Sequence, residues 1–108
     1  MQAAKKLYGE FNNIACFHCQ QSAEKYLKGL LILLDKEFRK SHDLNYLLDL
    51  LEFSSPEVIM SAAELLTEYS VEARYPGDFS DIPNHETQEV IKNAELIKAF
   101  VLGKIPVK

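Results

Sequence analysis

The stretch FRKSHDLNYLL contains side chains that can bind an anion or move a proton. Arg39 and Lys40 carry positive charge that suits a phosphate. His42 changes protonation near neutral pH, so it can act as a general base or contact a phosphate. The alternative is structural: Ser41 or Asp43 caps the helix that follows, and His42 bonds to a backbone group. The sequence leaves both interpretations open.

A second candidate cluster lies in VEARYPGDF. Arg74 can bind a phosphate, and Tyr75 can stack on a base or another ring. Alternatively, Arg74 ends a helix where its charge suits the helix dipole, and Tyr75 and Pro76 pack the following loop against the protein. His85 lies near the expected start of the last helix, where we expect a surface position.

A polar stripe is expected on the helix predicted for residues 12–34. His18, Gln21, Lys25 and Lys28 are spaced three, four and three positions apart, which places them on one side of a helix. Gln20 and Glu24 lie beside them, and Glu24 pairs with Lys28 four positions later. This stripe is either a solvated face or a surface that faces a cleft or a second subunit.

The two cysteines, Cys16 and Cys19, have the C-x-x-C spacing of redox and zinc sites. A redox pair needs an exposed first thiol at a strand-to-helix turn, and a zinc site needs four ligands. These cysteines fall inside a helical pattern, and no second ligand pair is evident. We therefore expect cysteines buried in the core and no metal site.

The net charge, the absent motifs and the short apolar runs argue against several classes of function. The net charge of −4 argues against a generic nucleic-acid coat, although it allows a local basic groove. There is no Walker loop, dinucleotide fingerprint, nucleophile elbow or HExxH motif, so no cofactor is expected. The longest apolar run, LLILL, is too short to span a bilayer, and MQAAKKLYGE lacks the apolar segment of a signal peptide. We expect a soluble, cytoplasmic protein.

Helical periodicity without strand-like alternation predicts an all-α protein, and 108 residues fit a single domain, 1–108. The expected helices are residues 2–8, 12–34, 43–53, 56–73 and 84–102. The residues expected to begin or cap helices are Asn12 or Asn13, Asp43, Ser55 (before Pro56) and Asn84. The residues expected to end helices are Gly9, Gly103 and Pro106.

Two of these helices indicate how the core is built. The helix at residues 12–34 has a core face made of Cys16, Cys19, Ala23, Tyr26, Leu27, Leu30 and Leu34. The helix at residues 43–53 is apolar on several sides, which predicts burial from more than one direction. Part of that burial is expected from a second chain, and a homodimer is the commonest closed assembly.

Three segments, in this order, resemble the HEPN domain, in particular its stand-alone prokaryotic type. They are QSAEKYLK at residues 21–28, HDL at residues 42–44 and RYP at residues 74–76. The resemblance covers the chain from about residue 3. It implies an up-and-down bundle of four to five helices that usually dimerises. It also implies nucleotide or RNA binding and partnership with a minimal nucleotidyltransferase, often as a toxin–antitoxin pair.

The resemblance has two departures. Ribonuclease members carry an Arg followed, after four to six residues, by a His; here no His follows Arg74 until His85, and Arg39 and His42 are too close together. Catalytic residues are therefore left unassigned, and a metal-independent ribonuclease toxin or a non-catalytic dimeric scaffold stays as an alternative. The expected first helix is also shorter than the family's, so we expect some core surface to be left uncovered.

The ligand-binding prediction combines the polar stripe with the two clusters. The residues predicted to bind a nucleotide or RNA are His18, Lys25, Lys28, His42, Arg74 and Tyr75.

Overall fold

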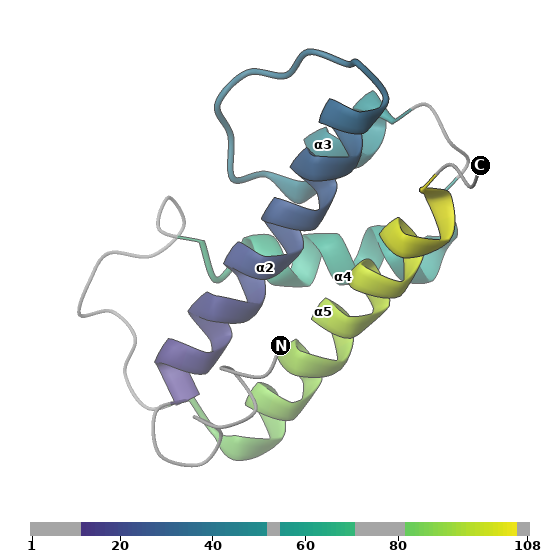
Figure 1. The fold of residues 1–108 in the computed structure, drawn as a ribbon. Helices are drawn as coiled ribbons and strands as arrows, with labels where there is room; N and C mark the ends of the chain where they lie inside the picture. Colours follow the sequence, from purple (N-terminus) through teal and green to yellow (C-terminus); the bar gives the residue numbers. More distant parts are fainter. Residues whose placement is uncertain (1–11, 52–54, 71–81, 106–108) are drawn as a thin grey trace.

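The structure is a computed structural model that describes residues 12–51, 55–70 and 82–105. These residues form four α-helices and no strand (Figure 1). The helices are α2 (Asn12–Leu33), α3 (Leu44–Leu50), α4 (Glu57–Thr67) and α5 (Asn84–Lys104). The prediction of an all-α helical bundle is confirmed. The expected helix at residues 2–8, together with Arg74 and Tyr75, lies outside the described residues.

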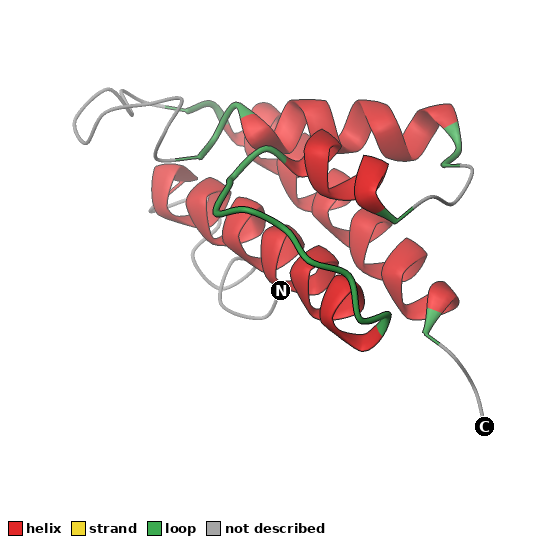
Figure 2. Ribbon diagram, turned by 90° about the horizontal axis from the view of Figure 1, so that it is seen from above, coloured by secondary structure: helices red, strands yellow, loops and turns green. Residues whose placement is uncertain are grey.

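The two long helices, α2 and α5, lie side by side and start at the same end of the bundle (Figure 1). The side chain of Asn12 joins these starts, because its Nδ2 donates to Asn84 Oδ1 at 2.8 Å and to the carbonyl of Ile82 at 2.7 Å. α4 packs mainly against α5, and the short α3 contacts α2 and α4. The connection between α2 and α3 runs back along α2, as seen from above in Figure 2. This return path brings the predicted site residues of the loop next to those of α2.

The core lies between α2, α4 and α5 and contains most of the predicted core face of α2. Cys16, Cys19, Ala23, Leu27 and Leu30 are all buried, as predicted. Tyr26 and Leu34 are only partly buried and pack against the edge of the core. The helix at residues 44–50 buries Leu44, Leu47 and Leu48, which confirms its extensive burial.

Some predicted helix boundaries are wrong. Pro56 and Pro83, rather than Ser55 and Asn84, occupy the N-cap positions of α4 and α5. A proline side chain has no hydrogen-bond acceptor, so only the backbone carbonyl of each proline takes part. The carbonyl of Pro56 accepts from the N–H of Met60, and the carbonyl of Pro83 accepts from the N–H of Thr87. Asn84 is instead the first helical residue.

The helix ends also differ from the prediction. α4 stops at Thr67 instead of continuing towards residue 73, because the next three N–H groups bond to carbonyls only three residues back. Such bonds tighten the last turn into 3₁₀ geometry. α5 continues through Gly103 to Lys104, so Gly103 does not end it. α3 ends at Leu50, and residues 52–54 lie outside the described residues.

The C-terminus of α2 is closed by Asp35, whose φ of 59° is in the left-handed region. The N–H of Lys36 donates to the carbonyl of Leu31 at 2.9 Å, and the N–H of Asp35 donates to the carbonyl of Ile32 at 3.0 Å. This is the Schellman arrangement, in which glycine is the usual left-handed residue. Asp35 is unfavourable here for two reasons: its Cβ is strained in this conformation, and its charge lies at the negative end of the helix dipole.

We therefore expect Asp35→Gly to raise the free energy of unfolding by about 0.5–1 kcal/mol. Urea denaturation followed by circular dichroism measures this change. Asp49→Gly is the matched control, because Asp49 is an exposed residue inside the right-handed α3 and glycine should destabilise that helix. A loss of stability in both variants would show that the turn after α2 does not need a left-handed residue.

Candidate functional site

The polar side chains of α2 and of the α2–α3 loop meet at one carboxylate, that of Glu24. Glu24 is only 6% exposed. Its Oε2 accepts from Lys28 Nζ at 2.9 Å, and its Oε1 lies 2.6 Å from His42 Nδ1. Gln20 Nε2 also donates to Oε1, at 3.1 Å. We call these four residues, Gln20, Glu24, Lys28 and His42, the Glu24 cluster.

The helical repeat of α2 places three members of the cluster in line. Gln20, Glu24 and Lys28 are spaced four residues apart, so they follow one another along the helix surface. Each comes one position after a core residue, so these three residues lie along the edge of the core. Gln20 is fully buried, and its side chain is satisfied on both sides: it also donates to the carbonyl of His42 at 3.4 Å and accepts from Gln21 Nε2 at 2.8 Å.

The fourth member, His42, comes from the loop and is held there by the start of α3. Asp43 is the N-cap of α3, and its side chain accepts from the N–H groups of Asn45 and Tyr46. Ser41 Oγ accepts from the N–H of Asp43 at 3.0 Å. The helix-capping interpretation of this stretch is thus confirmed, but the His42 ring bonds to a carboxylate rather than to the backbone.

Two aromatic contacts hold the rest of the loop. The Arg39 guanidinium lies 3.9 Å from the centre of the Tyr46 ring. The backbone N–H of Arg39 donates to Tyr46 Oη at 3.0 Å. Lys28 Nζ lies 5.9 Å from the centre of the Phe38 ring. Arg39 therefore contacts Tyr46 of α3 while remaining exposed, and Lys40 is exposed as well.

The electrostatics of Glu24 favour its ionised form. Burial on its own raises the pKa of Glu24, but hydrogen bonds from Lys28, His42 and Gln20, together with the charge of Lys28, lower that pKa below its usual value overall. A buried carboxylate at neutral pH therefore organises this part of the protein.

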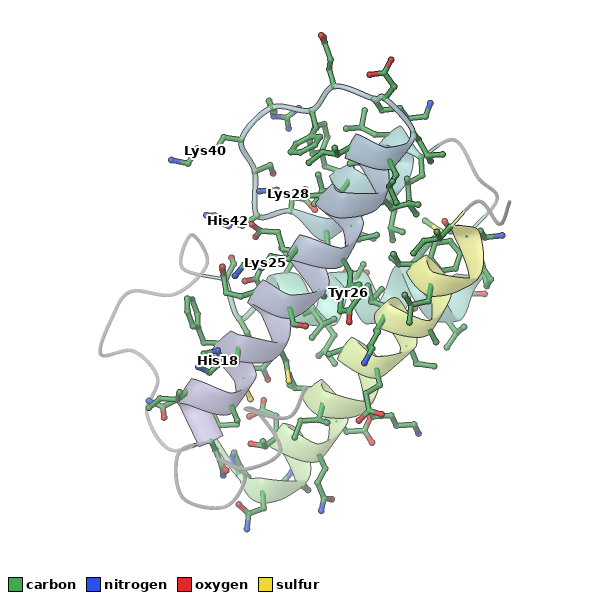
Figure 3. The ribbon with its side chains drawn as sticks, viewed as in Figure 1. His18, Lys25, Tyr26, Lys28, Lys40 and His42 are labelled. Atoms are coloured by element: carbon green, nitrogen blue, oxygen red, sulfur yellow. The ribbon has the colours of Figure 1, made fainter. Side chains whose placement is uncertain are left out.

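The structure brings together part of the predicted ligand-binding set. Lys28 and His42 both bond to Glu24, and His18 and Lys25 are exposed on the same side of α2 (Figure 3). Lys25 also borders an open depression of about 270 Å³ with Ser22 and Tyr26. Arg74 and Tyr75 lie outside the described residues, so their roles stay predictions.

Sequence reasoning placed Gln20 beside the polar stripe but missed its hydrogen bond to Glu24 and the contact between Glu24 and His42. It recognised the Glu24–Lys28 pair, which the structure confirms. The available signal was the four-residue spacing of Gln20, Glu24 and Lys28 directly beside a core stripe, which predicts partly buried polar side chains that need partners.

The two cysteines are buried in the core of the bundle, as predicted. Burial raises the pKa of the Cys19 thiol to about 12, so it stays protonated at neutral pH. Cys16 Sγ lies 3.8 Å from Thr87 Oγ1 on α5. Within residues 12–51, 55–70 and 82–105, no three His, Cys, Asp or Glu residues are grouped so that they could hold a metal ion.

Comparison with known families identifies the chain. The family model of the HEPN domain matches residues 1–105. The chain belongs to the HEPN domain family. No curated protein and no solved structure matches the chain significantly. In this HEPN domain the segments QSAEKYLK and HDL, which carried two parts of the resemblance, are in direct contact through Glu24 and His42. Among the helices that the structure describes, none is both long enough and apolar enough to cross a membrane.

We expect Glu24→Gln to lower the free energy of unfolding by about 1–3 kcal/mol at pH 7, because the buried cluster loses its charge-assisted hydrogen bonds. A carboxyl group with a lowered folded-state pKa contributes stability above its unfolded pKa, about 4.3, and loses that contribution as pH falls through the folded pKa. The difference between wild type and variant should therefore shrink in acid.

Urea denaturation of both proteins between pH 7 and pH 3 measures this effect. Glu89→Gln, which removes a charge from an exposed position on α5, should leave stability nearly unchanged throughout. A difference between wild type and Glu24→Gln that is constant across this pH range would contradict an ionised Glu24 in the folded protein.

Proposed function

We propose that this HEPN-domain protein binds the phosphates of RNA or of a nucleotide along one side of α2. The observation that supports this proposal is a gathering of cationic and His side chains on that side, from both α2 and the loop (Figure 3). We call this set the basic row: it consists of His18, Lys25, Lys28, Lys40 and His42.

The members of the basic row differ in the charge they offer a ligand. Lys28 is already paired with Glu24 at 2.9 Å, which offsets much of its charge. Lys25 and Lys40 are exposed, so their positive charge is accessible to a ligand. The nearby carboxylate of Asp43 is bonded to two N–H groups at the start of α3, which reduces its repulsion of an anion.

Arg74 and Tyr75 complete the proposed site. They follow α4 in the sequence, and their predicted roles are a phosphate contact for Arg74 and stacking on a base for Tyr75.

Lys25→Ala and Lys40→Ala should each weaken binding of a short single-stranded RNA and reduce the slope of log affinity against log salt by about 0.7. Fluorescence anisotropy over a salt series measures both quantities. Lys92→Ala, at an exposed position on α5, is the matched control and should bind as wild type does.

The outcome also separates the alternative functions. Intact RNA recovered after binding supports a recognition role, whereas products that end in a 2′,3′-cyclic phosphate would identify a ribonuclease. Equal effects of Lys92→Ala and Lys25→Ala would mean that binding is not located on the basic row. Absence of binding to RNA and to nucleotides would leave a scaffold role.

The partners that we propose are a second copy of the chain and a minimal nucleotidyltransferase, in a toxin–antitoxin-type pair. HEPN domains often dimerise, and large apolar side chains are exposed at helix ends in the single chain. These side chains are Ile14 at the start of α2, Ile32 and Leu33 at its end, Val58 and Met60 at the start of α4, and Leu102 at the end of α5. The nucleotidyltransferase follows from the resemblance to stand-alone prokaryotic HEPN proteins.

Co-expression with a small nucleotidyltransferase encoded beside this chain should give a complex that survives size-exclusion chromatography. Light scattering should give a mass that contains two copies of the HEPN chain. A monomeric chain that elutes apart from the transferase at micromolar concentration would contradict both partner proposals.

A further inference from the structure

Within the Glu24 cluster, only one of the two ring nitrogens of His42 makes a hydrogen bond. Nδ1 faces Glu24 Oε1 at 2.6 Å, and Nε2, on the far side of the ring, has no hydrogen bond to the described part of the chain. In that part of the chain, no side-chain nitrogen or oxygen is both buried and without a partner. Nε2 therefore reaches solvent, which agrees with the 23% exposure of the His42 side chain.

The contact with Glu24 decides which nitrogen of neutral His42 carries the proton. An ionised carboxylate only accepts hydrogen bonds, so the proton of the 2.6 Å contact belongs to Nδ1. A neutral imidazole has a single N–H, and Nε2 is then left with a lone pair. Two interactions hold the backbone of His42 in place. Gln20 donates to the His42 carbonyl, and the next residue, Asp43, is the N-cap of α3.

An acceptor at this position differs from the lysines of the basic row. The ammonium groups of Lys25, Lys28 and Lys40 only donate, and they suit phosphates, which RNA and DNA share. A lone pair is complementary to a hydroxyl group. Within a nucleic-acid chain, the hydroxyl that distinguishes RNA from DNA is the ribose 2′-hydroxyl.

We propose that Glu24 is a positioning residue that presents His42 Nε2 as an acceptor for the 2′-hydroxyl of a ribonucleotide, so that the basic row prefers RNA to DNA. This inference rests on the proposed function, because it requires a nucleic-acid chain on the basic row. It adds the class of ligand and assigns Glu24 a role that acts through His42.

The proton position can be tested without a ligand. In ¹⁵N NMR spectra of the histidine rings above pH 7.5, wild-type His42 should show a protonated Nδ1 and an unprotonated Nε2. Glu24→Gln should remove this fixed preference, and the control Glu89→Gln should keep it. A wild-type His42 protonated on Nε2 would overturn the proposal.

The preference itself can be tested with two short oligonucleotides of one sequence, one RNA and one DNA, that contain adenine and cytosine only. At the same pH as the NMR test, with His42 neutral, the wild type should bind the RNA about fivefold more tightly, which is the contribution of one ordinary hydrogen bond. His42→Asn keeps an amide near the position of Nδ1 and has no group at that of Nε2, so this variant should bind both chains almost equally. His85→Asn, on the exposed start of α5, should keep the wild-type preference.

The possible results separate the inference from the proposed function. Equal wild-type affinity for the two chains would overturn the inference and leave phosphate binding on the basic row intact. Failure to bind either chain would overturn both. If His42→Asn does not fold, as judged by circular dichroism, Glu24→Gln serves as the second variant and should also lose most of the preference.

Discussion

The arrangement of this HEPN domain depends on a carboxylate buried beside its core. An unpartnered charge at such a depth costs several kcal/mol, so Glu24 needs donors close by. α2 supplies two of them, Lys28 and Gln20, from the neighbouring turns, and the third is His42, eighteen positions along the chain. To deliver His42, the loop must reverse after α2, and the left-handed Asp35 provides that reversal.

The same interaction divides the polar residues of α2 into two groups. Gln20 and Glu24 face inward and fix the loop, whereas His18 and Lys25 face outward. Lys28 contributes mainly to the internal pairing. In the proposed function, binding of an external anion therefore rests on the exposed lysines, and the orientation of His42 rests on the buried Glu24 and Gln20.

The features predicted correctly from sequence are those that local geometry controls. Helical periodicity placed Cys16 and Leu27 in the core, and a short polar side chain before an apolar run placed the cap at Asp43. The contact between Glu24 and His42 was not predicted, because it depends on the path of a ten-residue loop and not on spacing along one helix. Pro56 at a cap position was missed because its carbonyl, and not a side chain, receives the bond.

The geometry of His42 bears on recognition more directly than on cleavage. Acid–base cleavage of RNA needs a proton acceptor and a proton donor placed at the same phosphate. In the described part of the chain, His42 offers one nitrogen to solvent while the other is held by Glu24, and Lys28 is engaged by the same carboxylate. A ring that is fixed in orientation and tautomer is well suited to reading a hydroxyl group.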